Sequence, residues 1–295
     1  MVWAAASFFF FNIFSSWLVV LANKYVFLAG FRLVCLLTTL HQLNTALVGY
    51  AQSAFKTARS INSDAVKDTP HVKTVDKIMY AVLFDASVVG MNLSLMFNTV
   101  GTYQLMKLAV LPCVASLEAF FFRDKLSMFR FATLSIILEG SIIAVFDEQL
   151  GVKITATGLL AGLVGAFATA AQTVFLKHLQ SKYDTPGSVL LGSLSLYCAG
   201  LLFVVSPIID MKISGLGLSA YFGTVLSLMK HLFTSHLSFL VALSCIAAAC
   251  VNLSQYLIIG KFSALVFQVL GQVKMVGTIA WGIILFDEGV GIKKL

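Results

Sequence analysis

Apolar stretches of about twenty residues follow one another along most of the chain, and they restrict its fold more than any other feature. A helix rises 1.5 Å per residue, so about twenty residues cross the ~30 Å hydrocarbon core of a bilayer. The stretches of roughly that length number nine, at residues 3–28, 33–54, 77–98, 101–122, 129–147, 154–177, 185–208, 237–259 and 264–286. The sequence therefore predicts an all-α protein that crosses a membrane many times.

The composition supports the same interpretation. Of the 295 residues, 59% are hydrophobic and only 11% are charged, whereas about a quarter of the residues in a soluble domain are charged. The net charge of +7 comes from Lys and Arg scattered over short loops, which is typical of membrane proteins and gives no clustered basic surface for nucleic acid. More of these cations fall on the side of the N-terminus, which the positive-inside rule places in the cytosol.

Two segments interrupt the apolar pattern. Phe55–Asp76 is rich in Lys, Asp and Ser and is predicted to be a solvated loop, and the less polar Ile209–His236 is interpreted as a second linker. The five cysteines lie inside apolar stretches without a Cys-x-x-Cys pair, and the chain has no His-Glu-x-x-His motif, Gly-rich phosphate loop or Gly-x-Ser-x-Gly elbow. We therefore expect no metal, no cofactor and no enzyme activity.

The chain also resembles itself at an offset of 164 residues. The matched positions are Tyr103-Gln104 with Phe267-Gln268, Phe122 with Phe286, Asp124 with Glu288, and Arg130 with Lys294. An odd number of spans separates the two copies, which reverses their orientation and is typical of the inverted repeats of secondary transporters. We predict a first repeat at 1–150 (spans 1–5) and a second at 151–295 (spans 6–9). The last helix of the second repeat is missing, so we expect the natural chain to continue beyond Leu295 into a tenth helix.

Two lysines lie inside apolar stretches, where an ionisable side chain is costly and usually functional. Lys107 lies about 9 Å from the luminal end of its span and Lys274 about 15 Å from the cytosolic end of its own, so their depths differ by ~6 Å in a ~30 Å core. Two ammonium groups at that spacing suit a diphosphate. Further residues on or beside the same helix faces are predicted to line the site: Tyr103, Gln104, Gln268, Gly271 and Gln272.

Each of these lysines also has a structural interpretation. A lysine can extend its ammonium group to the membrane surface, or it can pair with a buried acid, for which the candidates are Asp85, Glu118 and Glu139. Glu118 lies close in sequence to Arg123 and Lys125 and is interpreted as part of a structural ion pair at a cytosolic helix end.

Lys24 and Asn252 are candidates for the same binding site with less specific support. Lys24 ends the first span beside Asn23, where anchoring at the membrane interface is an equally good explanation. Asn252 lies in the eighth span, where hydrogen bonding between helices is the commoner explanation for an amide side chain.

Four stretches of the chain carry a resemblance to a known family: Ser15–Lys24 (SSWLVVLANK), the Leu-Thr-Thr-Leu-His run that ends at His41, Gly90–Lys107 (GMNLSLMFNTVGTYQLMK) and, most specifically, Asn252–Lys274 (NLSQYLIIGKFSALVFQVLGQVK). On these residues the chain resembles the nucleotide-sugar/triose-phosphate transporter family of the drug/metabolite transporter superfamily, from about Phe11 to the C-terminus. Its pattern is most similar to the group of plant Golgi UDP-xylose and UDP-rhamnose/UDP-galactose transporters. The resemblance implies a ten-helix fold of two inverted five-helix repeats, and it implies that Lys107 and Lys274 bind substrate phosphate.

The segment around Lys274 departs from the subgroups of this family. GDP-mannose transporters carry Gly-Ala-Leu-Asn-Lys where this chain has Leu270–Lys274, which disfavours a guanine nucleotide. Plastid triose-phosphate translocators follow the second lysine with Arg, whereas Met275 follows it here, so one cation of that phosphate clamp is absent. The UDP-sugar group usually reads Gly-His-x-Lys-Thr where this chain reads Gly271-Gln272-Val273-Lys274-Met275.

Together these features predict a nucleotide-sugar antiporter. It would move a nucleoside diphosphate-sugar, and a UDP-sugar before others, into the Golgi lumen in exchange for a nucleoside monophosphate. A translocator of triose phosphate or sugar phosphate and a non-transporting membrane scaffold are the alternatives. The expected location is the Golgi membrane, with the ER membrane or plastid envelope as alternatives. The expected partners are the two nucleotides and membrane lipids, and a homodimer and a monomer both remain open.

Overall fold

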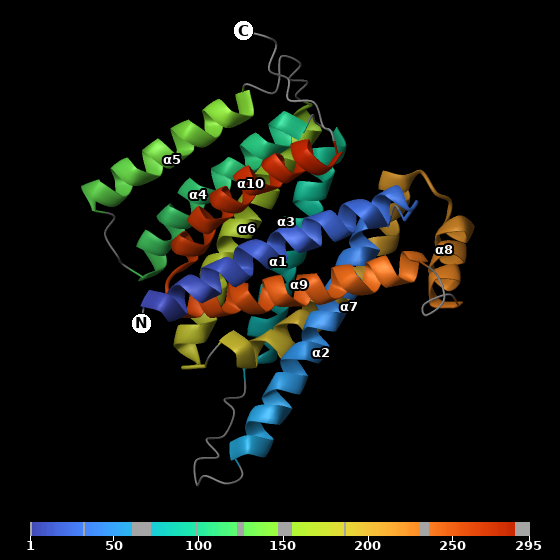
Figure 1. Cartoon of the computed structure of the whole chain (residues 1–295), viewed down its shortest axis with the longest axis horizontal. Helices are drawn as coiled ribbons and strands as arrows, with labels where there is room; N and C mark the ends of the chain where they lie inside the picture. Colours follow the sequence, from blue (N-terminus) through green and yellow to red (C-terminus); the bar gives the residue numbers. More distant parts are fainter. Residues whose placement is uncertain are drawn as a thin grey trace. The chain divides into compact units, whose positions relative to one another are not determined.

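The computed structural model describes residues 2–31, 33–60, 72–97, 100–122, 127–146, 155–185, 187–230 and 236–286, and the regular structure within them is helical. The long helices of this part of the chain are α1 (Val2–Leu28), α2 (Val34–Ser60), α3 (Thr74–Phe97), α4 (Val100–Phe122), α5 (Met128–Phe146), α6 (Ala156–Lys182), α7 (Gly187–Ser214), α9 (His236–Lys261) and α10 (Ala264–Phe286). A shorter helix of 13 residues, α8 (Leu218–Lys230), lies between α7 and α9 in the chain (Figure 1).

The long helices coincide with the nine predicted spans to within six residues at either end, so the all-α prediction is confirmed. Four helical segments of the described chain are long and apolar enough to cross a membrane: Ala6–Leu28, Ala156–Lys182, Val189–Ser214 and His236–Lys261. The chain is therefore a multi-pass membrane protein. Crossing by the other five long helices stays a prediction. In α2, polar side chains such as His41, Gln42 and Asn44 reduce the apolar content.

Both predicted linkers contain more helix than the sequence analysis assigned to them. α2 continues to Ser60 and α3 begins at Thr74, so only the middle of Phe55–Asp76 connects helices. In Ile209–His236, α7 continues to Ser214 and α8 follows after three residues. The linker interpretation was wrong for α8 because Tyr221 and Val225, one helical turn apart, pack against a buried apolar cluster of α1 and α2. That i, i+4 spacing was the signal available in the sequence.

The helices group into two compact units. Unit 1 comprises Met1–Val82 and His178–Lys261, and it contains α1, α2, α7, α8 and α9. Unit 2 comprises Leu83–Lys177 and Phe262–Leu295, and it contains α4, α5 and α10 with most of α3 and α6. Each unit takes helices from both halves of the chain, so the compact units are not the predicted repeats 1–150 and 151–295, which remain a prediction about sequence and orientation.

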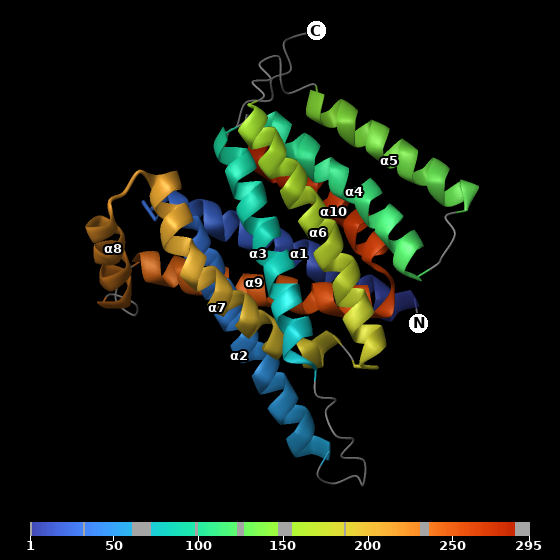
Figure 2. The same cartoon turned by 180° about the vertical axis from the view of Figure 1, so that it is seen from behind.

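In unit 1, α2 and α7 pack side by side at two glycines (Figure 1, Figure 2). A Cβ built on Gly49 would collide with the backbone of Gly192, and a Cβ built on Gly192 would lie 3.0 Å from the backbone nitrogen of Tyr50. Small residues at a membrane helix interface let backbones approach and gain dispersion contacts, which drive association where lipid surrounds both helices. The two glycines therefore define the closest point of the α2–α7 pair.

This contact predicts that replacing glycine by alanine has opposite effects on thermal stability at Gly192 and at Gly200 of α7. Gly192→Ala should lower thermal stability, because the new methyl group meets the α2 backbone and overpacking costs about 1–3 kcal/mol. Gly200→Ala is the matched control, since a Cβ there meets nothing within 4 Å and alanine favours a helix over glycine by about 1 kcal/mol. Thermal unfolding of the two purified variants measures the difference. Equal stability of both would show that the glycine contact is not close.

A buried carboxylate holds the start of α2 against the end of α7. Asp210 is fully buried, and its two oxygens accept hydrogen bonds from the backbone N–H groups of Cys35 at 2.7 Å and Leu36 at 2.8 Å. The first N–H groups of a helix have no partner within the helix, and the helix dipole favours a negative charge there. Asp210 therefore caps α2 from another helix, which the sequence analysis did not anticipate.

Polar side chains also connect α1 and α2 to α9 inside unit 1. The Asn12 amide donates to the Ser254 hydroxyl at 2.7 Å. The His41 ring nitrogen Nε2 lies 2.7 Å from the Ser244 hydroxyl, which itself donates to the Asn23 side-chain oxygen. These pairs satisfy polar groups in a region where water is scarce, and they fix the partners that α1 and α2 take.

In unit 2, α3 and α6 pack through another glycine pair. A Cβ on Gly90 would lie 2.7 Å from the Gly165 Cα, and one turn away the Ser87 and Thr169 hydroxyls are 2.5 Å apart. A buried apolar cluster joins α3, α4, α6 and the start of α10: Met91, Val110, Val114, Ala166, Ala170, Val174 and Ala264. This core positions the two helices that carry the predicted lysine site.

Candidate functional site

The helices α4 and α10 pack against each other in unit 2 and carry the two intramembrane lysines. Both helices have 23 residues. α10 begins and ends 164 residues after α4 does, which is the offset found between their sequences. The same offset relates the last residue of α3, Phe97, to the last residue of α9, Lys261. The matches of Asp124 with Glu288 and of Arg130 with Lys294 involve residues outside the described part of the chain.

The Lys274 ammonium group is held on one face of α10. Its Nζ lies 4.5 Å from the centre of the Phe267 ring, an arrangement in which the ring face attracts the cation. The Lys274 side chain is half-buried and that of Lys107 is exposed. The Lys107 and Lys274 charges repel each other electrostatically. A shared binding site for the two ammonium groups stays a prediction.

Space is left open beside Lys274. Gly271 lies one turn before it, and a Cβ at Gly271 would meet only the Gln268 side-chain oxygen, at 4.0 Å. The Gln268 side-chain nitrogen donates to the Thr173 hydroxyl of α6 at 3.2 Å. Gln268 is thereby oriented with its nitrogen on α6 and its oxygen towards the gap at Gly271. An anion bound in this gap would lie beside Lys274.

The remaining predicted residues are placed less completely. Gln272 is half-buried on α10. Tyr103 and Gln104 lie on α4 within one turn of Lys107, and their side chains are outside the described part of the structure. Lys24 and Asn252 belong to unit 1. The Asn252 amide donates to the Thr45 hydroxyl at 3.0 Å, which is the helix–helix contact of the alternative interpretation.

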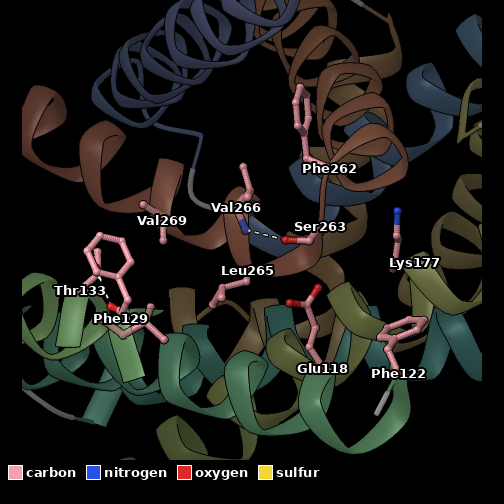
Figure 3. Close-up of a pocket in the computed structure, with 11 residues that line it drawn as sticks. Glu118, Phe122, Phe129, Thr133, Lys177, Phe262, Ser263, Leu265, Val266 and Val269 are labelled. Carbon is pink, nitrogen blue, oxygen red and sulfur yellow. Dashed lines mark hydrogen bonds between the residues drawn. The ribbon is translucent and has the colours of Figure 1, made fainter. Parts of the chain in front are cut away.

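Glu118 has a structural partner other than the predicted one. Its Oε1 accepts a hydrogen bond from the Ala264 backbone N–H at 2.8 Å. The Ser263 hydroxyl accepts one from the Val266 N–H at 3.1 Å (Figure 3). The two side chains together cap the start of α10. The predicted pairing with Arg123 and Lys125 involves residues outside the described part of the chain.

A pocket of about 620 Å³ lies at this same end of α10. Figure 3 shows side chains of α4, α5 and α10 around it, with Glu118 and Lys177 on one side. Its lining residues are Glu118, Phe122, Phe129, Thr133, Leu134, Lys177, Phe262, Ser263, Leu265, Val266 and Val269, and none of them is a predicted site residue. Among the described lining residues the Glu118 and Lys177 charges offset each other, so these residues offer a phosphate no net positive charge. This lining gives no support for an anion site in the pocket.

The described residues include no group of three His, Cys, Asp or Glu side chains that could hold a metal ion. The chemistry that the site offers is electrostatic: two cations, an oriented amide and an open face on α10. Such a set is suited to binding an anion.

Comparison with known proteins gives close relatives over nearly the whole chain. It is 31% identical over 287 residues to UDP-rhamnose/UDP-galactose transporter 1 of Arabidopsis thaliana, a match that covers 96% of this chain and 76% of the relative. It is 34% identical over 210 residues to UDP-xylose transporter 3 of Arabidopsis thaliana, covering 71% of this chain and 55% of the relative. No family model matches. A chain in a solved crystal structure shares the fold, with a TM-score of 0.69 and 14% identity over 98% of this chain and 91% of that chain.

Proposed function

The chain belongs to the nucleotide-sugar/triose-phosphate transporter family, and on that premise we propose that it exchanges a UDP-sugar for a nucleoside monophosphate across the Golgi membrane. Its family consists of transporters and not of enzymes. The relatives are named for UDP-rhamnose, UDP-galactose and UDP-xylose, which have the uridine diphosphate part in common. That shared part supports a site that recognises uridine and diphosphate and tolerates different sugars.

The observation that carries the proposal is the pair of repelling ammonium groups on α4 and α10. Like charges close together inside a membrane protein are costly, and a bound diphosphate offsets both charges at once. The empty carrier should resist reorientation for the same reason, so transport proceeds by exchange. Lys107 and Lys274 hold the phosphates, and Gln268 with Gln272 and Gly271 shapes the adjoining face of α10.

The fold of this transporter is an inverted repeat, in which α1, α2, α3 and α4 correspond to α6, α7, α9 and α10. The pattern of helix pairs supports it. The α2–α7 pair and the α4–α10 pair each join a helix to its own counterpart. The α1–α9 pair of unit 1 corresponds to the α6–α3 pair of unit 2, because α6 is the counterpart of α1 and α3 is the counterpart of α9. The equal bounds of α4 and α10 add a second, independent argument. Substrate sites of such repeats lie near the membrane midplane, which is the depth of Lys274.

Exchange in liposomes tests the function. Purified protein is reconstituted into liposomes loaded with UMP, and uptake of labelled UDP-galactose, UDP-xylose and UDP-rhamnose is measured with and without the internal nucleotide. We expect uptake of at least one UDP-sugar that depends on internal UMP. Uptake of triose phosphate without uptake of any UDP-sugar would instead establish the phosphorylated-metabolite translocator. Folded protein that exchanges nothing in the panel would indicate the membrane scaffold.

The segment Leu270–Lys274 predicts the base that the site prefers. It lacks the Gly-Ala-Leu-Asn-Lys pattern of GDP-mannose transporters, so UMP should stabilise the purified protein more than GMP at equal concentration. Thermal-shift titration with UMP, GMP, AMP and CMP measures the order directly. A larger shift with GMP than with UMP would contradict the assignment of a uridine nucleotide.

A further inference from the structure

The pocket at the start of α10 is charged on one side and apolar on the other. Glu118 and Lys177 lie on the charged side, and Phe129 and Val269 lie on the opposite side (Figure 3). Thr133, which also lies there, donates its hydroxyl to the Phe129 carbonyl of its own helix at 2.9 Å, so its polar group is satisfied. The volume of about 620 Å³ is within the ~300–1,000 Å³ of small-molecule sites. The pocket therefore suits an amphipathic molecule.

The helix α6 places the charged side near the surface of the membrane. This helix is one of the four segments that can cross, and its 27 residues measure about 40 Å, so a centred helix extends ~5 Å beyond each side of a ~30 Å core. Lys177 lies about 7.5 Å before the end of α6 at Lys182. Its backbone is thus within a few ångströms of the core boundary, and its side chain is long enough to reach the headgroup region.

The apolar side of the pocket is open at the α5 rim. Phe129 lines the pocket and is nevertheless 81% exposed, and its neighbours Met128 and Phe131 are exposed as well. Exposed apolar side chains of a multi-pass membrane protein meet acyl chains, which are as apolar as leucine. A molecule of the bilayer can therefore enter the pocket sideways, without passing through water.

The two charges of the pocket select among membrane lipids. Glu118 and Lys177 attract each other electrostatically, and together they carry no net charge. A headgroup with one negative charge is attracted by Lys177 and repelled by Glu118. Phosphatidylethanolamine carries an ammonium group and a phosphate, so each of its charges meets an opposite charge here. The Glu118 carboxylate accepts one hydrogen bond from Ala264, but the two oxygens of a carboxylate can accept about four.

We propose that this pocket binds phosphatidylethanolamine. The ammonium group of the lipid donates hydrogen bonds to Glu118, its phosphate accepts them from Lys177, and one acyl chain lies along Leu265 and Val269. Charge-assisted hydrogen bonds of this kind are about twice as strong as neutral ones. The lipid thereby bridges α4, α6 and α10 within unit 2. The inference does not depend on the proposed transport function.

Native mass spectrometry of purified, delipidated protein tests the proposal. The protein is titrated with palmitoyl-oleoyl phosphatidylethanolamine and with palmitoyl-oleoyl phosphatidylglycerol, which has the same acyl chains and one negative charge. We expect the first lipid to bind about fivefold more tightly, the factor that a partly exposed charge pair gives. Equal or tighter binding of phosphatidylglycerol would overturn the proposal. Because no nucleotide is present, failure in this experiment is separate from failure of the transport proposal.

Two charge variants test whether the lipid lies in the pocket. Glu118→Gln keeps an oxygen for the Ala264 N–H but removes the negative charge beside Lys177, so the preference should reverse in favour of phosphatidylglycerol. Lys177→Met keeps an apolar stem and removes the phosphate partner, so phosphatidylethanolamine should bind about fivefold more weakly. Lys212→Met is the same change on the exposed side of α7 in unit 1 and should bind as wild type does. A wild-type preference in all three variants would show that the lipid binds elsewhere.

A pair of valine variants tests the position of the acyl chain. Val269→Phe narrows the apolar side of the pocket, so both lipids should bind more weakly and to a similar degree. Val204→Phe, at an exposed position of α7 in unit 1, is the matched control and should bind both lipids as wild type does. Thermal unfolding without lipid checks that each variant is folded. Unchanged affinity of folded Val269→Phe for both lipids would overturn the proposal.

Discussion

Replacing Lys274 by alanine is expected to weaken UMP binding by about tenfold to 150-fold. The loss corresponds to the ~1.5–3 kcal/mol of a charge-assisted hydrogen bond between an ammonium group and a phosphate. Lys274 is the cation that α10 presents beside the open space at Gly271, so no other described side chain of that face replaces its charge. Thermal-shift titration of UMP on purified wild type and Lys274→Ala measures the change.

Two further variants make this prediction specific. Lys274→Arg should restore binding only in part, because a planar guanidinium does not reproduce a compact point charge. Lys107→Ala should also weaken UMP binding, since the same anion offsets both charges. Lys212→Ala on the exposed side of α7 in unit 1 is the control and should bind UMP as wild type does. Equal stabilisation by UMP in wild type, Lys107→Ala and Lys274→Ala would remove both lysines from the site.

The second large effect is expected from Asp210→Ala in unit 1. The substitution leaves the Cys35 and Leu36 N–H groups without partners in a fully buried position. Loss of a helix cap costs about 0.5–2 kcal/mol and loss of a charged hydrogen bond about 1.5–3 kcal/mol, so the total should be on the order of 3 kcal/mol. The apolar cluster that includes Leu36 and Tyr221 should loosen with it. The expected result is a clearly lower unfolding temperature of the purified protein.

Asp210→Asn serves as the companion variant. Its amide keeps one oxygen that can accept from the start of α2, but it loses the negative charge that the helix dipole favours. We expect a stability between those of wild type and Asp210→Ala. If both variants unfold at the wild-type temperature, the contact between Asp210 and α2 does not stabilise the fold. UMP binding by the surviving folded protein should be unchanged, because Asp210 is outside the lysine site.

The membrane helices could be predicted from the sequence because each is a long apolar stretch bounded by polar residues. The register of α4 and α10 was also predictable, since both copies keep their aromatic and glutamine positions. The helix α8 was missed because its 13 residues are too few to cross a bilayer and its apolar side chains pack on other helices. A length criterion for spans does not detect a helix of that kind.

The candidate site was predictable only in its charges. A lysine in an apolar run is visible in the sequence, but the contact of Gln268 with Thr173 joins helices 95 residues apart. The hydrogen bond that Glu118 accepts from the α10 backbone could not be predicted, because Glu118 and Ala264 are 146 residues apart in the sequence. The predicted pairing of Glu118 with Arg123 and Lys125 stays a prediction. Asp85 was considered only as a partner for the lysines. Its lack of any hydrogen-bond partner among the described residues is a property of packing that no local pattern contains.

The polar contacts of α1 and α2 with α9 have a consequence for the order of synthesis. Asn12 bonds to Ser254, 242 residues later, and His41 lies against Ser244, 203 residues later. During synthesis α1 and α2 enter the bilayer long before α9 has been made. Until then Asn12 and His41 face lipid or make temporary contacts. The first two helices are therefore completed by nearly the last one. A nascent chain that stops before α9 lacks the native hydrogen-bond partners of the Asn12 amide and the His41 imidazole, and this distinguishes it from the complete protein.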